Sequence, residues 1–396
     1  MGARFAARME GVRPNAIGDL LRHGADPDLI SFAGGYPDPA LFPVAELRVV
    51  FEELLTGDPS VLQYTVSDGL PSLRGHIAAR MNRDGTTCTA DDVLVLQGAQ
   101  QGLDLVAKLV LDPGDVVVTE NPTFLGALIA FAPCQPAYAP VRTDDEGMDP
   151  DDLERVLAAD PRAKLVYTMP DFQNPMGVTL SLERRRRLVE LANRFDVLVL
   201  EDSPYRDLRF EGDALPTLKS LDTEGRVVYL GSFSKTLTPG MRLGWAVASG
   251  EIRAKLGLLK LAADTQCSTL NMAAASAYLD RFDLDAHVAD VRGAYRRKRD
   301  LMLETIARTF PSEVRWTNPS GGLFTWLTFP GGLDAAAFMR DEAIPKAKVA
   351  YVPGGTFYPV TQEPNHARVN FSGVPDDRIV EGITRLGELL QTVIGR

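Results

Sequence analysis

The chain has 396 residues, of which 45% are apolar and 24% are charged, and a chain of this size usually forms more than one hydrophobic core. Its formal net charge of −11 argues against nonspecific nucleic-acid binding, which needs a basic surface. Three cysteines and four histidines have neither disulfide-framework nor metal-ligand spacing, so we expect no metal site and a reducing compartment, the cytoplasm.

The N-terminus has no apolar stretch of signal-peptide length. The longest apolar runs elsewhere are far shorter than the roughly 20 residues that span a bilayer. We therefore expect no association with a membrane.

Short apolar runs rich in β-branched residues recur through the middle of the chain. They do not alternate with polar residues, which is typical of strands buried on both faces of a mainly parallel sheet. The predicted strands are 93–96, 116–118, 165–167, 197–200, 227–230 and 243–248. Helix-like stretches, including 100–111 and 182–194, lie between them. This alternation predicts an α/β layered fold.

The C-terminal part has a different pattern. A long helix is predicted at 291–309, strands at 324–329, 349–352 and 367–371, and a final helix at 376–392. We interpret this as a smaller α+β domain that also takes in N-terminal residues. The expected division is an N-terminal segment at 1–45, a large domain at 46–290 and a small domain at 291–396.

A lysine follows the predicted strand 227–230, in the segment Gly231-Ser232-Phe233-Ser234-Lys235. Ligands collect at the carboxyl ends of strands in such sheets, and a lysine of lowered pKa can form an imine with an aldehyde. Ser232 and Ser234 are placed to donate to a phosphate, and the guanidinium of Arg242 suits a bidentate phosphate contact.

Two further polar segments follow predicted strands. Asp202 comes after 197–200, and its carboxylate could pair with a protonated pyridine nitrogen and keep that ring electron-poor. Tyr205 could bind an oxygen of the same ring. Asn174 lies in the turn 171–177 after 165–167, where its amide can donate to a phenolate-type oxygen or to a carboxylate.

Three other features complete a candidate site. Gly98 joins strand 93–96 to a helix, whose free N–H groups could bind phosphate. Phe124 could stack on a flat ring. Arg368, among apolar strand residues, is costly to bury without an anion such as a substrate carboxylate. Each feature alone has an ordinary structural explanation, but together they supply every part of a pyridoxal-phosphate (PLP) site.

The sequence resembles the class I/II aminotransferases, which are PLP enzymes of fold type I. Within them it is similar to the subgroup of 2-aminoadipate and kynurenine aminotransferase-like enzymes. The resemblance implies a large domain with a mainly parallel seven-stranded sheet between helices, plus a smaller α+β domain. The matching segments are 31–35, 41–43, 63–64, 171–177, 201–205, 231–245, 319–322 and 352–354.

The resemblance also implies a role for each candidate residue. Lys235 would be the Schiff-base lysine and proton shuttle, Asp202 would pair with the ring nitrogen, and Arg368 would bind the substrate carboxylate. Tyr205 and Asn174 would hold the ring oxygen, and Phe124 would stack on the ring. The phosphate would be held by Ala99, Gln100, Ser232, Ser234 and Arg242. Family members are homodimers with shared sites, so Tyr64 would reach the partner's phosphate, while Gly35 and Asn15 would lie at the substrate.

The substrate is less clearly specified. Acidic-substrate members of the subgroup carry an arginine near 15–18, where this chain has Gly18 or its neighbours; Arg13 and Arg22 are the nearest alternatives. We expect an apolar, aromatic or broad amino-acid donor, with 2-aminoadipate as an open alternative, and 2-oxoglutarate or pyruvate as acceptor.

Other functions are compatible with parts of this sequence. The same scaffold supports lyase, cyclase and hydroxylating PLP chemistry, and some regulatory PLP-binding proteins resemble this family. A nicotinamide oxidoreductase is less consistent with the sequence, because no GxGxxG motif follows the early strands.

Overall fold

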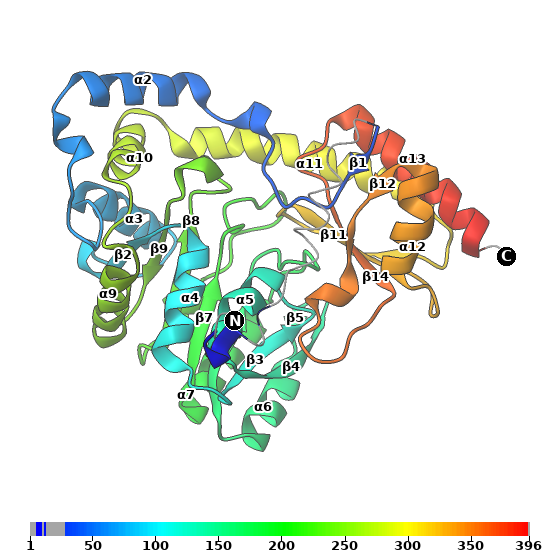
Figure 1. The fold of residues 1–396 in the computed structure, drawn as a ribbon, viewed down its shortest axis with the longest axis horizontal. Helices are drawn as coiled ribbons and strands as arrows, with labels where there is room; N and C mark the ends of the chain where they lie inside the picture. Colours follow the sequence, from blue (N-terminus) through cyan, green and yellow to red (C-terminus); the bar gives the residue numbers. More distant parts are fainter. Residues whose placement is uncertain (1–4, 10–11, 13–27, 395–396) are drawn as a thin grey trace.

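The computed structural model describes residues 5–9, 12 and 28–394, and a large sheet forms its centre (Figure 1). The strand order is β2-β9-β8-β7-β6-β3-β4-β5. The strands are β2 (Val93–Leu96), β3 (Val116–Asn121), β4 (Ala137–Asp144), β5 (Gly147–Met148), β6 (Ala163–Thr168), β7 (Leu198–Asp202), β8 (Val227–Ser232) and β9 (Gly244–Val247).

The pairs β4–β3, β3–β6, β6–β7 and β7–β8 are parallel. Strand β9 is antiparallel to both neighbours, and β5 to β4. The predicted mainly parallel α/β sheet is therefore confirmed. The two-residue strand β5 is added to the seven that the family resemblance implied, and β4 and β5 were not predicted from the residues.

The non-alternating strands are explained by burial on both faces. Val117 and Val228 point into the core shared with α4 (Ala99–Val110) and α5 (Leu125–Phe131). Their neighbours Val116 and Val227 point into the core shared with α6 (Pro150–Ala159) and α7 (Leu182–Phe195). Since each face is covered by helices, neither face needs polar side chains.

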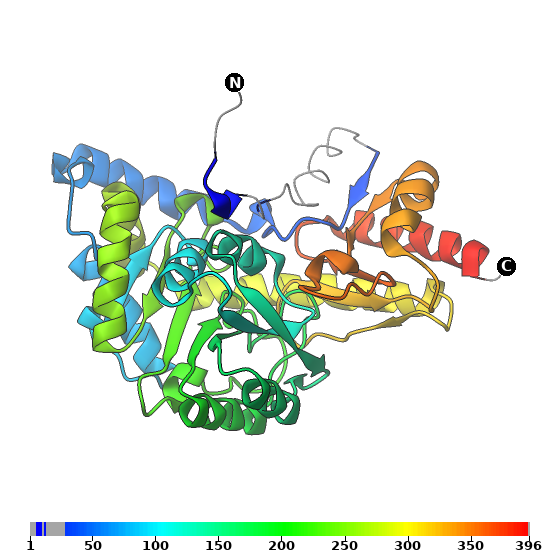
Figure 2. The ribbon, with the colours of Figure 1, turned by 60° about the horizontal axis from the view of Figure 1, so that its bottom comes forward.

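A third core covers the β2–β9 end of the sheet, with α2 (Val44–Thr56), α3 (Pro71–Arg83) and α10 (Thr269–Arg281). From there α11 (Leu284–Thr309) runs to the smaller sheet (Figures 1 and 2). The helix begins before the predicted residue 291, because the Asp283 carboxylate caps it by accepting from the N–H groups of Asp285 and Ala286.

The smaller sheet has the order β10-β11-β14-β13. These strands are β10 (Arg315–Trp316), β11 (Phe324–Thr328), β14 (His366–Asn370) and β13 (Val352–Pro353). The predicted single strand 349–352 is wrong: β12 (Val349–Ala350) instead pairs in parallel with β1 (Ile30–Ser31). Tyr351 separates β12 from β13 and buries its side chain, whose hydroxyl donates to the Ala335 carbonyl.

Shorter elements connect these layers. The remaining helices are α8 (Leu218–Leu221), α9 (Gly250–Asp264), α12 (Ala335–Phe338) and α13 (Asp376–Ile394), with a π-helix at Met339–Ala347 and short 3-10 turns at Ala7–Met9, Pro39–Leu41, Pro59–Leu62, Ala90–Asp92, Ala132–Cys134, Pro239–Met241 and Gly354–Phe357.

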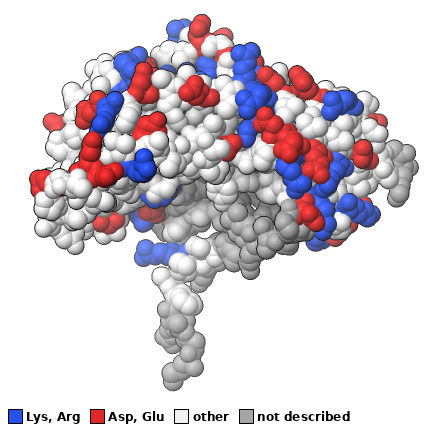
Figure 3. All heavy atoms as spheres, turned by 90° about the horizontal axis from the view of Figure 1, so that it is seen from above, with Lys and Arg blue, Asp and Glu red and all other residues white. Residues whose placement is uncertain are grey.

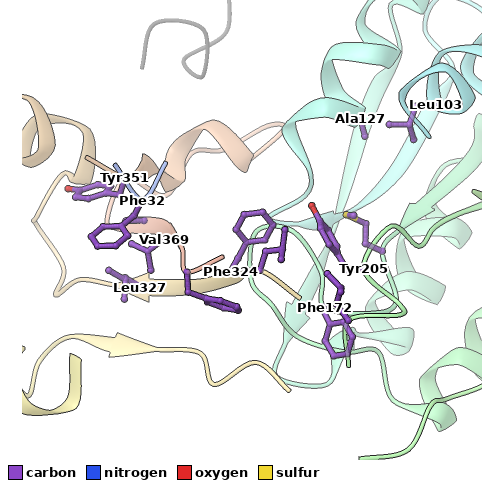
Figure 4. Close-up of a cluster of buried hydrophobic side chains, with 14 of the residues drawn as sticks. Phe32, Leu103, Ala127, Phe172, Tyr205, Phe324, Leu327, Tyr351 and Val369 are labelled. Carbon is purple, nitrogen blue, oxygen red and sulfur yellow. The ribbon is translucent and has the colours of Figure 1, made fainter. Parts of the chain in front are cut away.

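One buried apolar cluster joins the two sheets (Figure 4). Tyr205 and Phe324 meet edge to face at the junction, with ring centroids 5.7 Å apart. Phe172 lies beside them, against Gly321, where an added Cβ would come within 2.3 Å of its ring. The ends of β6 and β7 are thereby held against the small sheet.

The surface shows no segregation of charge in the view of Figure 3, where acidic and basic side chains are interspersed. Among the described residues, no helix is long and apolar enough to cross a membrane. Likewise, no group of three or more His, Cys, Asp or Glu side chains in that part of the chain could hold a metal ion.

Candidate active site

A cavity of about 320 Å³ lies where the carboxyl ends of the central strands face the small sheet. It brings together most of the sequence-predicted site residues: Gly35, Ala99, Gln100, Phe124, Asn174, Asp202, Tyr205, Ser232, Ser234, Lys235, Arg242 and Arg368. A larger cavity of about 610 Å³, between β4 and the β10–β11–β14 strands, contains none of them.

Lys235 lies in the turn after β8, and its Nζ donates to the carbonyl of Gly35 at 2.9 Å. Desolvation in the cavity lowers the pKa of this amine to about 8, and the positive charges of Arg368 and Arg242 add to the effect. An appreciable fraction of the amine is therefore neutral near physiological pH, as a nucleophile that attacks an aldehyde requires.

Asp202 is the last residue of β7 and is 2% exposed. Its Oδ2 accepts a hydrogen bond of 3.0 Å from the Tyr167 hydroxyl. Its Oδ1 is buried without a partner. Burial raises the pKa of Asp202 to about 7, and the bond from Tyr167 opposes that rise. An unpartnered carboxylate oxygen in a cavity wall suits a protonated ring nitrogen.

The other end of the cavity is rich in donors. Helix α4 begins at Ala99, so the helix provides no acceptor for the N–H groups of Ala99 and Gln100, whereas the N–H of Gln101 donates to the Gly98 carbonyl. Gly98 has φ +74°, and an added Cβ there would lie 2.8 Å from Nη2 of Arg242. Gly98 does not line the cavity itself, but its missing side chain allows Arg242 to approach α4. This end suits a phosphate.

Arg368 on β14 is 3% exposed. Nη1 donates to Oδ1 of Asn174 at 2.9 Å and Nη2 to the carbonyl of Ala33 at 2.8 Å, while the guanidinium stacks on Phe324 at 4.2 Å. Its Nε is buried without a partner, and burial lowers the pKa of Arg368 to about 10. A buried cation held only by neutral acceptors suits an anionic ligand.

Asn174 and Tyr205 are neighbours in the cavity wall. Nδ2 of Asn174 lies 3.5 Å from the Tyr205 hydroxyl, and burial raises the pKa of Tyr205 to about 12. The phenol therefore remains a neutral donor at physiological pH. Phe124, immediately before α5, also lines the cavity.

Tyr64 does not line this cavity, and its side chain is 81% exposed. Its neighbours are held in place: the carbonyl of Gln63 accepts from Thr269, and the N–H of Thr65 donates to Gln266. Asn15, Gly18, Arg13 and Arg22 lie outside the described residues.

The cavity has further lining residues that sequence reasoning missed: Gly34, Tyr36, Leu103, Met169, Pro204 and Pro239. Gly34 and Tyr36 flank Gly35, so adjacency was a usable signal. Leu103 lies one helical turn after Ala99 and could have been found from helix periodicity. Met169 lies just beyond the end of β6 and had no comparable signal.

The residues present fit PLP. The unpartnered oxygen of Asp202 matches a pyridine nitrogen, the donor-rich end near Ala99 and Arg242 matches a phosphate, and the Lys235 amine matches the aldehyde.

The comparisons with known proteins agree with this chemistry. The family model "Aminotransferase class I and II" matches residues 32–386. The aromatic-amino-acid aminotransferase 1 of Thermococcus litoralis is 39% identical, covering 98% of this chain and 94% of that protein. The 2-aminoadipate transaminase of Thermus thermophilus is 36% identical, covering 97% and 95%. The crystal structure of a multiple substrate aminotransferase from Thermococcus profundus superposes with a TM-score of 0.94 at 38% identity, covering 99% and 98%.

Proposed function

Because the chain belongs to the class I and II aminotransferases and is thus a PLP-dependent transaminase, we propose that its preferred donors are aromatic and large apolar L-amino acids. The amino group passes to a 2-oxo acid, for which 2-oxoglutarate and pyruvate are the candidates. 2-Aminoadipate is a poorer donor in this proposal.

The charge of the cavity wall carries the proposal. Among the described lining residues the cations are Lys235, Arg242 and Arg368, and each has a partner in the cofactor or in the α-carboxylate. No further described cation lines the cavity to bind a side-chain carboxylate. The rest of the wall is largely apolar or aromatic, including Tyr36 and Phe124, and this favours an apolar substrate side chain. The similarity to an aromatic-amino-acid aminotransferase supports the same choice.

We assign the chemical steps to three side chains. PLP, when bound, supplies an aldehyde that bonds to amines and a ring that takes up the electron pair left at Cα. The neutral amine of Lys235 would hold the cofactor and, when free, would move the proton at the substrate Cα. Asp202 keeps the ring nitrogen protonated, and Arg368 orients the α-carboxylate.

The other predicted residues hold the ring and its phosphate in this proposal. Tyr205 and Asn174 donate to the ring oxygen, and Phe124 stacks on one ring face. The phosphate is bound by Ala99, Gln100, Ser232, Ser234 and Arg242.

We further propose that the protein is a homodimer in which Tyr64 reaches the partner's phosphate. Its side chain is exposed, as are those of Leu55, Leu62 and Val66, which are near it in the sequence; several exposed apolar residues in one stretch of chain favour an interface. A cytoplasmic location agrees with three free cysteines. The proposed division at residues 46–290 and 291–396 puts the domain boundary inside α11.

A donor-by-acceptor panel tests the proposal. Phenylalanine, tyrosine, tryptophan, leucine, 2-aminoadipate, glutamate and alanine are each paired with 2-oxoglutarate and pyruvate, with Lys235→Ala as the blank. We expect the highest kcat/KM for the aromatic donors. A strict preference for 2-aminoadipate would overturn the proposed substrate class, and turnover without transfer to any oxo acid would overturn transamination.

A further inference from the structure

We propose that Tyr167 is a positioning residue for this reaction: its hydroxyl orients the Asp202 carboxylate toward the cofactor's ring nitrogen and stabilises the ionised form. The inference rests on the proposed role of Asp202.

The sheet register brings the two side chains together. Tyr167 on β6 pairs with Leu200 on the neighbouring parallel strand β7, and Asp202 lies two residues beyond Leu200, on the same face of the sheet. The hydroxyl donates to Oδ2 of Asp202 at 3.0 Å. The Tyr167 ring is fully buried and meets Phe131 edge to face, with centroids 5.6 Å apart. The donor is therefore held rigidly by its packing.

This contact distinguishes the two oxygens of Asp202. Oδ2 is occupied by Tyr167, and Oδ1 is buried in the cavity wall without a partner. A carboxylate fixed at one oxygen presents the other in a single direction, so the geometry for a charge-assisted bond to a ring N–H exists before the cofactor arrives.

Three titratable groups on the surrounding elements interact electrostatically with Asp202. They are Tyr167 of β6, Glu120 of β3 and Tyr205 after β7. Among the described residues only Tyr167 donates a hydrogen bond to the carboxylate. Glu120 is an acid whose own pKa is raised to about 7, mainly by burial, while Thr168, Gln173 and the Met169 N–H donate to it. Glu120 therefore cannot stabilise the Asp202 charge.

The loss of the Tyr167 hydroxyl would change the pKa of Asp202 in one direction. Burial raises the pKa of Asp202 to about 7 even though the Tyr167 hydroxyl opposes the rise. Without the hydroxyl this pKa moves further up, and more of the carboxyl is neutral at pH 7. A neutral acid pairs poorly with a protonated ring nitrogen, so PLP binding weakens most at and below neutral pH.

The test measures PLP dissociation constants of the apoenzyme from pH 6 to pH 9, by quenching of tryptophan fluorescence, for wild type and Tyr167→Phe. We expect affinity to fall about tenfold at pH 7, as befits a lost hydrogen bond to a charged group, and the difference to shrink toward pH 9. A PLP analogue with C–H in place of the ring nitrogen should bind both proteins equally.

Tyr351→Phe is the matched control, because it also removes a buried tyrosine hydroxyl bond, to the Ala335 carbonyl at 2.8 Å, away from the cavity. It should leave the pH dependence of PLP binding unchanged. Circular dichroism of both variants checks that each is folded.

A double-mutant cycle with Asp202→Asn supplies a second measurement. In the Asp202→Asn background, where the carboxylate is gone, we expect Tyr167→Phe to cause almost no further loss of PLP affinity. An equal loss for PLP and its ring-carbon analogue, or full additivity in the cycle, would overturn the inference and leave Tyr167 a packing residue. Failure of the proposed function is distinguishable, because it would change the donor preference of wild type and leave the effect of Tyr167→Phe on PLP binding as expected.

Discussion

Nη1 of Arg368 donates to Oδ1 of Asn174 at 2.9 Å, and this bond joins β14 of the small sheet to the turn that follows β6 of the large sheet. The residue proposed to bind the substrate carboxylate therefore contacts a residue proposed to hold the cofactor ring. Because the guanidinium otherwise contacts only neutral groups among the described residues, its binding energy remains available for an incoming anion.

Arg368→Gln should raise KM for donor and acceptor together, because both carry the carboxylate that the guanidinium binds. Removing one partner of a buried charged hydrogen-bond pair costs about 3 kcal/mol, which is about 100-fold in kcat/KM. Arg368→Lys keeps the charge without the bidentate geometry, so its kcat/KM should lie between those of wild type and Arg368→Gln. Steady-state kinetics check this, and an unchanged KM in the glutamine variant would exclude the assigned role.

PLP capture by the apoenzyme should accelerate as pH rises through about 8, because the neutral form of Lys235 is the nucleophile and its pKa is lowered to about 8, mainly by burial. Arg368 also contributes to that lowering. Arg368→Gln should therefore shift the profile to higher pH. Stopped-flow absorbance after mixing apoenzyme with PLP gives the profile; a shift to lower pH would contradict the electrostatic account.

Gly98→Ala should weaken PLP binding about tenfold. The new Cβ would lie 2.8 Å from Nη2 of Arg242 and displace the guanidinium from the phosphate end. Gly114→Ala is the matched control, since Gly114 also has positive φ, +89°, but an open surrounding. Both substitutions place a side chain on a backbone of positive φ, which costs about 1–3 kcal/mol. Only Gly98→Ala should change the PLP dissociation constant, and equal effects would refute the contact-based explanation.

Asp171→Asn should destabilise the fold by about 3 kcal/mol, because it leaves buried cations without their anion. The Asp171 carboxylate is fully buried and accepts from Arg185, Arg206 and Arg209. Burial opposes ionisation, but the guanidiniums outweigh it and lower the pKa of Asp171. Its contribution is therefore present above the unfolded-state pKa of about 4 and is lost as pH falls through the lower folded value.

Urea unfolding at pH 7 and at low pH checks this prediction. The free energy of unfolding of wild type and Asp171→Asn should differ at pH 7 and converge in acid. A constant difference at all pH values would show that the substitution acts through packing alone.

The buried central strands could be predicted because helices on both faces leave a purely apolar signature, as in β2 and β8. Strand β4 was missed because it lies near the edge, is only partly buried and contains Pro140. The strand predicted at 349–352 was wrong because Tyr351 separates two short strands that belong to different sheets.

The polar site residues that follow strands could be predicted for a related reason. Lys235 and Asn174 lie in polar segments that follow buried strands, and parallel strands bring such ends to one edge. Tyr167 could not be recognised, because a tyrosine inside an apolar strand is indistinguishable from core. Its contact with Asp202 depends on β6 and β7 being neighbours, which the residues themselves do not specify.

The proposed mechanism depends on Lys235 as the residue that holds the cofactor. Borohydride reduction of the PLP-loaded enzyme, followed by proteolysis and mass spectrometry, tests it directly by identifying the lysine that carries the pyridoxyl group. We expect a single modified peptide containing Lys235 and no modification in Lys235→Ala. A pyridoxyl group on another lysine, or an unmodified Lys235 in an active transaminase, would contradict it.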